Sequence, residues 1–142
     1  MDSKRLRISP DLTVSEHQAN LARMKREGLT GLTLSCYGGA YGPIFPAGVD
    51  YDLSFLAHYP GITSLELQLP GQTSLEALKY VETSLESLSL GSTRKASLEP
   101  VGRCLKLKRL SNVENTKDVG VLAGLRSLEV LWLREHPKSG FL

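Results

Sequence analysis

Apolar residues recur along this chain in a six-residue pattern: an apolar residue, two variable residues, a Leu, one variable residue and a last apolar position. Residues 85–90 (Leu-Glu-Ser-Leu-Ser-Leu) and 128–133 (Leu-Glu-Val-Leu-Trp-Leu) show the pattern, and 29–34 and 62–67 repeat it. Residues 107–112 follow it except that Asn112 takes the last position. The last positions fall at 67, 90, 112 and 133, so the steps are 23, 22 and 21 residues. A motif that returns at this interval predicts a solenoid, in which each unit buries its apolar face against its neighbours.

Each copy of the motif alternates apolar and variable residues, which predicts a short strand. The strand centres fall near residues 7, 33, 66, 89, 111 and 132, giving six units. Short helical or turn segments are expected between the later strands, over 53–60, 75–81, 98–104 and 119–123. Because the chain always returns through the same kind of segment, successive strands are expected to be parallel. The stack should curve, with the sheet on its concave side and the helical segments on its convex side.

The first unit is longer and should act as an N-terminal cap. Residues 4–9 alternate charged and apolar residues, as in a half-buried strand. Thr13 and Glu16 have the spacing of a capping box, and Gly28 is placed to end the helix that follows. One face of this helix is predicted to carry Val14, His17, Leu21 and Met24. We interpret His17 on that face as a packing residue.

A segment rich in Gly, Pro and aromatic residues interrupts the repeats at 35–48. Such a composition predicts a long loop, and long loops in compact domains are often functional. In the functional interpretation, Tyr37 and Tyr41 contact a partner. In the alternative, the loop folds back so that its aromatic and apolar residues shield the edges of the first units.

The motif Leu-x-x-Leu-x-Leu-x-x-Asn/Thr, clearest at 85–93, 107–115 and 128–136, resembles that of leucine-rich repeat proteins. The period of about 22 residues and the segment 118–125 resemble bacterial internalin-type repeats. The resemblance implies an α/β fold, a right-handed leucine-rich-repeat solenoid with about six short parallel strands. It implies a single domain over 1–142, with a cap at 1–28, repeats at 29–136 and a tail at 137–142. The buried Asn of the family occurs only as Asn115, so irregular turns are expected after the other strands.

The residues between the motif leucines should point to the concave face, because side chains alternate along a strand. Three columns follow from this alternation. The first holds Arg5, Gly31, Ser64, Ser87, Arg109 and Val130. The second holds Arg7, Thr33, Glu66, Ser89, Ser111 and Trp132. The third holds Ser9, Ser35, Gln68, Gly91, Val113 and Arg134.

The last units bring the most distinctive residues of these columns together. Trp and Arg are enriched at binding hot spots, so we expect a partner-binding cluster of Arg109, Val113, Val130, Trp132 and Arg134. Glu66 and Gln68, on the more polar middle part of the concave face, complete the expected set of contact residues together with Tyr37 and Tyr41. In the alternative, Trp132 packs under the C-terminal tail as a cap. We interpret the basic spot of Arg5 and Arg7 at the other end as solvated surface.

Composition narrows the class of protein. With 142 residues, 41% hydrophobic and 23% charged, the chain reads as one soluble, folded domain. A net charge of +2 gives no argument for nucleic acid. No apolar run approaches the ~20 residues of a membrane span, and the N-terminus has no secretory signal. Cys36 and Cys104 lie far apart outside any metal-type pair, so we expect reduced thiols and a cytoplasmic protein.

The sequence predicts neither a catalytic site nor a metal site. The histidines at 17, 58 and 136 have no ligand at metal-binding spacing, and phosphate-binding and nucleophile motifs are lacking. We therefore expect no enzyme activity, cofactor or metal, and a non-catalytic protein–protein interaction module that binds a protein partner. One alternative is an inhibitory or immunity-type protein that occludes a toxin or enzyme. Another is a structural, self-associating solenoid segment, with a monomer or weak homo-oligomer formed through the C-terminal strand edge at Leu131.

Overall fold

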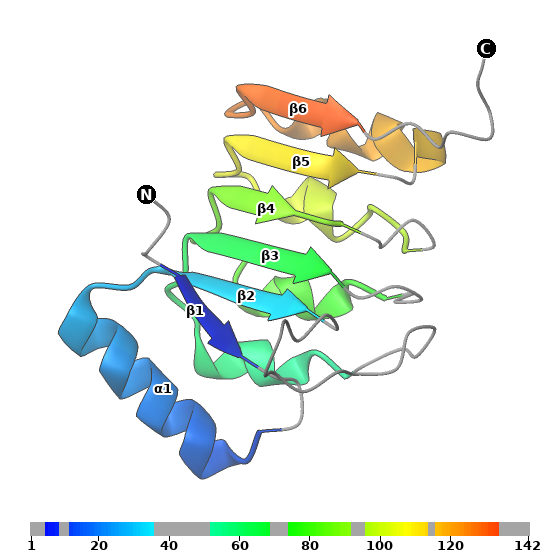
Figure 1. Ribbon diagram of the computed structural model, residues 1–142. Coiled ribbons are helices and arrows are strands. Elements are labelled where there is room, and N and C mark those ends of the chain that lie inside the picture. Colours follow the sequence, from blue (N-terminus) through cyan, green and yellow to red (C-terminus); the bar gives the residue numbers. More distant parts are fainter. Residues whose placement is uncertain are drawn as a thin grey trace.

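The strands of the protein form one parallel sheet. The computed structural model describes residues 5–8, 12–35, 52–68, 74–91, 96–113 and 116–133. The strands are β1 (Arg5–Ile8), β2 (Gly31–Ser35), β3 (Ser64–Gln68), β4 (Ser87–Ser89), β5 (Arg109–Val113) and β6 (Val130–Leu133). They pair in parallel in the order β1-β2-β3-β4-β5-β6 (Figure 1). The six predicted parallel strands are confirmed.

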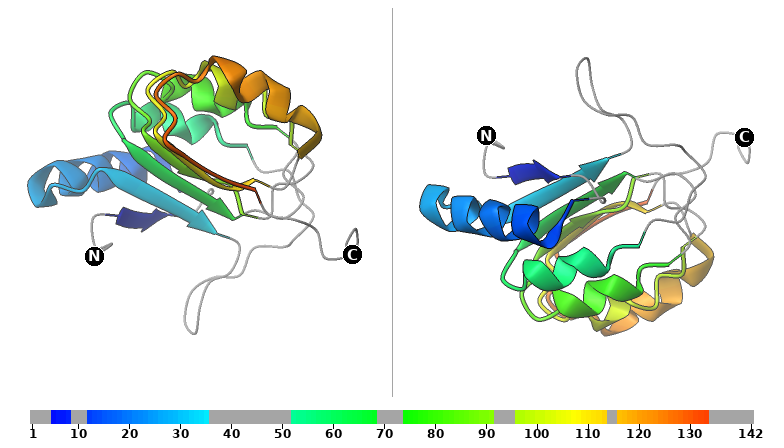
Figure 2. Two further views of the ribbon diagram at one scale, coloured as in Figure 1. Left: turned by 90° about the horizontal axis from the view of Figure 1, so that it is seen from above. Right: turned by 90° about the horizontal axis from the view of Figure 1, so that it is seen from below.

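Short helical segments return the chain from one strand to the next. These are 3-10 helices: η1 (Ser54–His58), η2 (Glu76–Tyr80), η3 (Val101–Arg103) and η4 (Thr116–Gly124). Their positions agree with the predicted segments. They form a second layer on one side of the sheet, and the other side carries no helix of the described chain (Figure 2). We call that other side the open face.

Leucines from successive units fill the space between the two layers. Leu32, Leu65, Leu88 and Leu110 lie in register on neighbouring strands and are buried. Backbone hydrogen bonds join the units just before each strand. Two consecutive N–H groups donate to one carbonyl of the preceding unit, as Thr63 and Ser64 do to Thr30. The same arrangement returns in the next units, which keeps the strand starts aligned along one rim.

The N-terminal cap contains α1 (Val14–Glu27). Thr13 and Glu16 form the predicted capping box, and Gly28 ends the helix with φ at 70°. His17 is buried and stacks on Phe55 of η1, which confirms its packing role. Val14 was predicted on the buried face but is 56% exposed. It is the first residue of the helix, and the first buried residue of α1 is His17, three residues further along.

Several predictions concern parts of the chain outside the described residues. The loop lies there apart from the β2 residue at 35, as do Cys36, the turns at 69–73, 92–95 and 114–115, and the tail at 137–142.

Candidate functional site: the open face of the sheet

The strand pairing tests the columns predicted for the open face. Arg5, Gly31, Ser64, Ser87, Arg109 and Val130 are cross-strand neighbours in that order. In the second column the order Arg7, Thr33, Glu66, Ser89 and Ser111 is also confirmed. The repeat motif therefore placed these side chains in register, as far as β6 in the first column and as far as β5 in the second.

Val113 does not belong to the open face, and its prediction as an exposed contact residue is wrong. It is fully buried and pairs with Leu133. The cause is an irregularity in β5, where the pairing shifts by one residue between Leu110 and Val113. Asn112, with φ at 59°, lies within this bulge. The extra residue reverses the alternation, so Asn112 keeps its polar side chain out of the core and Val113 takes the core position.

Trp132 lies on the open face, as predicted. Its neighbours Leu131 and Leu133 pair with the buried Leu110 and Val113, so they continue the core columns and Trp132 points the other way. Its side chain is 67% exposed. Val130, two residues earlier, is half-buried next to Arg109. The C-terminal tail that was expected as an alternative cover lies outside the described residues.

Glu66 and Gln68 are on β3, and the structure brings them together. The Nε2 atom of Gln68 donates to a Glu66 carboxylate oxygen at 2.7 Å. The hydroxyl of Thr33 donates to the other oxygen at 3.5 Å, and Nη1 of Arg5 lies 3.7 Å from that same oxygen. The carboxylate is thus held from three sides, which makes this part of the open face polar and ordered.

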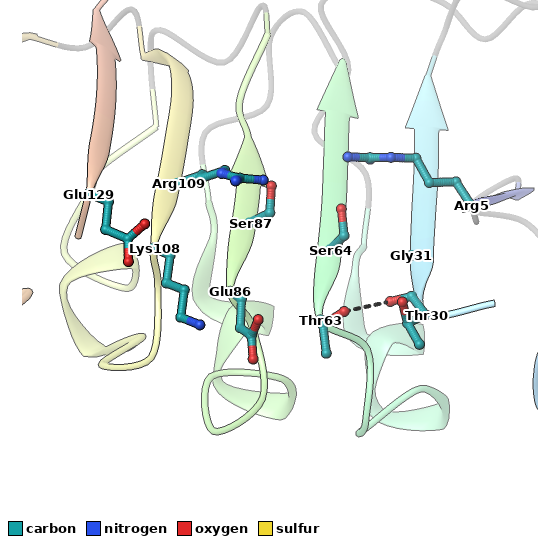
Figure 3. Close-up of a pocket in the computed structure, with 10 residues that line it drawn as sticks. All are labelled: Arg5, Thr30, Gly31, Thr63, Ser64, Glu86, Ser87, Lys108, Arg109 and Glu129. Atoms are coloured by element: carbon teal, nitrogen blue, oxygen red, sulfur yellow. Dashed lines mark hydrogen bonds between the residues drawn. The ribbon is translucent and has the colours of Figure 1, made fainter. Parts of the chain in front are cut away.

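A groove of about 430 Å³ runs across the strands at their amino ends. Figure 3 shows its floor and walls. We call it the arginine groove, and its lining includes Arg5, Gly31, Ser64, Ser87 and Arg109. Figure 3 shows the other lining residues in a second row that forms its rim: Thr30, Thr63, Glu86, Lys108 and Glu129.

Arg109 turns toward this groove and not toward Trp132. Figure 3 shows its guanidinium beside the hydroxyl of Ser87 on β4. The guanidinium of Arg5 reaches from β1 toward Ser64 on β3. The expected C-terminal cluster is therefore divided: Trp132 and Val130 remain on β6, and Arg109 joins Arg5 in the groove.

From the sequence, Arg5 was interpreted as solvated surface, and Lys108 and Gly31 received no binding role. In the structure Arg5 is partly buried and lines the groove. One available signal was Gly31 itself, because a glycine inside a strand marks a close approach of other groups. A Cβ atom at this position would lie 2.9 Å from Cγ of Arg5. Tyr37, Tyr41 and Arg134, also predicted to bind a partner, lie outside the described residues.

The described residues hold no group of three or more His, Cys, Asp or Glu side chains that could bind a metal ion. In the same part of the chain, no helix combines the length and apolar character needed to cross a bilayer. Burial lowers the pKa of His17, and the neighbouring His58 lowers it further. This pair lies between α1 and η1, away from the open face.

Comparisons with known proteins were made on sequence and on structure. No protein-family model and no curated protein matches the sequence. Among solved structures, the crystal structure of internalin C2 from Listeria monocytogenes is similar, with 22% sequence identity and a TM-score of 0.49. The match covers 84% of this chain and 57% of that chain. The repeat period of the sequence and the six-stranded parallel sheet together give the chain a leucine-rich-repeat fold.

Proposed function

We propose that the protein is a non-catalytic interaction module that binds a protein partner through the open face of its sheet. The observation that carries the proposal is the exposure of Trp132 on that face. An exposed tryptophan presents a large apolar surface to water, and anchors of this type dominate the energy of many interfaces. The repeat scaffold holds Trp132 on a strand, so little conformational entropy is lost on binding.

The surroundings of Trp132 support this proposal. Val130 on the same strand adds half-buried apolar surface, and Ser111 on β5 and Ser89 on β4 add small polar groups. An apolar anchor beside small, polar neighbours resembles the core and rim of a protein interface. We keep Arg134 and the loop at 35–48 as proposed additional contacts.

The test is capture of partners from an extract of the native host. The Trp132→Ala variant is compared with the unchanged protein and with Leu105→Ala. Leu105 is 63% exposed and lies on the turn after η3, so its variant removes a similar exposed apolar side chain away from the open face. We expect Trp132→Ala to lose at least about tenfold in recovery of the partner, from ~2 kcal/mol for a hot spot. Equal recovery by both variants, with unchanged thermal unfolding, would contradict the proposal.

Self-association is a second candidate, favoured by the edge of β6. Among the described strands β6 pairs only with β5, and Leu131 and Leu133 are 41% and 46% exposed. Exposed backbone and leucines on an edge strand are a template for pairing with another chain. Light scattering over a range of concentrations tests this: growth in mass that Leu131→Lys abolishes supports it, and a strict monomer contradicts it.

A further inference from the structure

We propose that the arginine groove binds a carboxylate side chain of the protein partner. The inference rests on the proposed function and adds the chemistry of the group that is recognised. Four observations on the described residues lead to it: the direction of two arginines, their unused hydrogen-bond donors, the lack of a side chain at Gly31, and the charges on the rim.

The two arginines converge from opposite sides. Arg5 on β1 and Arg109 on β5 are four strands apart, which is about 19 Å at the usual spacing of ~4.8 Å per strand. Figure 3 shows the side chains directed toward each other, with the hydroxyls of Ser64 and Ser87 between them. Both serines are on the open face in the same column as the arginines. A ligand in the middle of the groove would therefore meet a guanidinium on each side.

These groups have hydrogen-bonding capacity that the described chain does not use. Arg109 makes no hydrogen bond or ion pair with any described residue, and the same is true of the Ser64 and Ser87 side chains. Nη1 of Arg5 is shielded from solvent and has no hydrogen-bond acceptor among the described residues, where its one ion pair is the longer contact with Glu66. A set of donors around one space selects an acceptor-only ligand, and a guanidinium fits a carboxylate with two parallel hydrogen bonds.

Gly31 allows Arg5 to reach the groove. The Arg5 side chain crosses β2 at Gly31, where an added Cβ would lie 2.9 Å from its Cγ and 3.2 Å from Cβ of Ser64. Any other residue at this position would lift Arg5 off the sheet or push it aside. We therefore assign Gly31 as a positioning residue that acts through Arg5.

The charges on the rim favour one protein carboxylate over a polyanion. Glu86 and Glu129 border the groove, and Figure 3 shows Lys108 between them. A continuous phosphate backbone would meet these two carboxylates as well as the arginines, and the chain as a whole carries only +2. A single acidic side chain can enter between Arg5 and Arg109 while the rest of its segment meets the mixed charges of the rim.

The test measures binding of fluorescein-labelled hexaglutamate to the full chain by fluorescence anisotropy at about 0.1 M salt, where the screening length is ~10 Å, with hexaglutamine as the uncharged comparison. We expect hexaglutamate to bind more tightly than hexaglutamine. Arg5→Gln and Arg109→Gln should each weaken its binding by about tenfold, the loss of one charge-assisted hydrogen bond. Arg126→Gln makes the same change in net charge at an exposed turn that follows η4, and it should leave the affinity within about twofold because a distant charge is screened.

Gly31→Ala separates the positioning role from a general effect on stability. It should weaken hexaglutamate binding in the unchanged protein and have no further effect in the Arg5→Gln variant, because the group it displaces is then absent. Thermal unfolding shows which variants are folded. If Gly31→Ala does not fold, the comparison of Arg109→Gln with Arg126→Gln decides alone.

Three results would overturn the inference. The first is equal affinity for hexaglutamate and hexaglutamine. The second is an equal loss of hexaglutamate affinity in Arg126→Gln and Arg109→Gln. The third is that a single-stranded oligonucleotide of the same charge binds more tightly than hexaglutamate and that Arg109→Gln abolishes this binding. The assay uses neither Trp132 nor the native partner. Its failure would therefore remove the carboxylate assignment and leave the capture experiment on Trp132 to decide the proposed function.

Discussion

The Nδ1 atom of His17 lies 2.6 Å from the hydroxyl oxygen of Tyr59, in the interface where α1 rests on η1. The ring of His17 stacks on those of Phe55 and His58, with centroids 5.1 and 5.3 Å away. Its Nε2 atom is buried and has no hydrogen-bond partner among the described residues. The neutral imidazole leaves one weakly polar atom unsatisfied there, whereas the imidazolium would leave a charged N–H without an acceptor.

Stability is therefore expected to fall on acidification. Burial lowers the pKa of His17 below its ordinary value of 6.5, the nearby His58 lowers it further, and Glu16 opposes the shift. The unfolded chain, with the ordinary pKa, takes up a proton first as the pH falls. The free energy of unfolding should thus decline from about pH 7 downward, until His17 is protonated in the folded state as well. Urea unfolding between pH 8 and 5 measures this decline.

His17→Gln isolates the contribution of this histidine, because glutamine keeps hydrogen-bonding groups near Tyr59 but does not titrate. We expect a flatter pH profile for the variant than for the unchanged protein over the same range. Superimposable slopes would contradict the assignment of the effect to His17.

The bulge of β5 predicts an unequal response to substitution of Asn112. Its φ of 59° is tolerated by Asn and Gly but is strained in a β-branched residue. Asn112→Val should therefore lower the free energy of unfolding by ~2 kcal/mol from strain, in addition to the lost hydrogen bond from Asn112 Nδ2 to the Ser89 hydroxyl. Ser89→Ala removes the same hydrogen bond without strain and should cost ~1 kcal/mol. Equal losses in the two variants would show that the backbone at 112 is unstrained.

The bulge of β5 could not be predicted from the sequence, although the strands and their order could. Strands, order and pairing followed from the repeat because leucines at every second position must all enter one core, as Leu65 and Leu88 do. The same rule placed Val113 outside, since Asn112 occupied the motif's last apolar position. A polar side chain is costly in the core, and an apolar residue follows it at once. The bulge adds one residue to β5, so Val113 takes the core position and Asn112 stays outside the core. Alternation alone could not predict this change.

The direction of Arg109 was beyond sequence reasoning for another reason. The column fixes where its Cβ points, but a long side chain settles according to the space beside it. Ser87 and Ser64 are small and Gly31 has no side chain, so the room lies toward β1 and not toward Trp132. The sequence identifies the small residues of the first column, but the space that they leave for the two arginines exists only once the strands have paired.

Cys104 gives a chemical measure of folding. It is buried, and burial together with Glu82 raises the pKa of its thiol to about 12. The thiolate, which is the reactive form, is then scarce at neutral pH. In a Cys36→Ser variant, Ellman's reagent should find no reactive thiol in buffer and one thiol in denaturing urea. A fast reaction in buffer would mean that the core opens around Cys104.

The central claim is that this leucine-rich-repeat chain meets its partner with the open face of the sheet. Site-specific photo-cross-linking tests it most directly, with a photoreactive amino acid placed at position 132 on the open face or at position 105 beyond η3, in extract of the native host. We predict a discrete cross-linked product from position 132, lost when unlabelled protein competes, and none from position 105. A competable product from position 105 with none from position 132 would contradict the account.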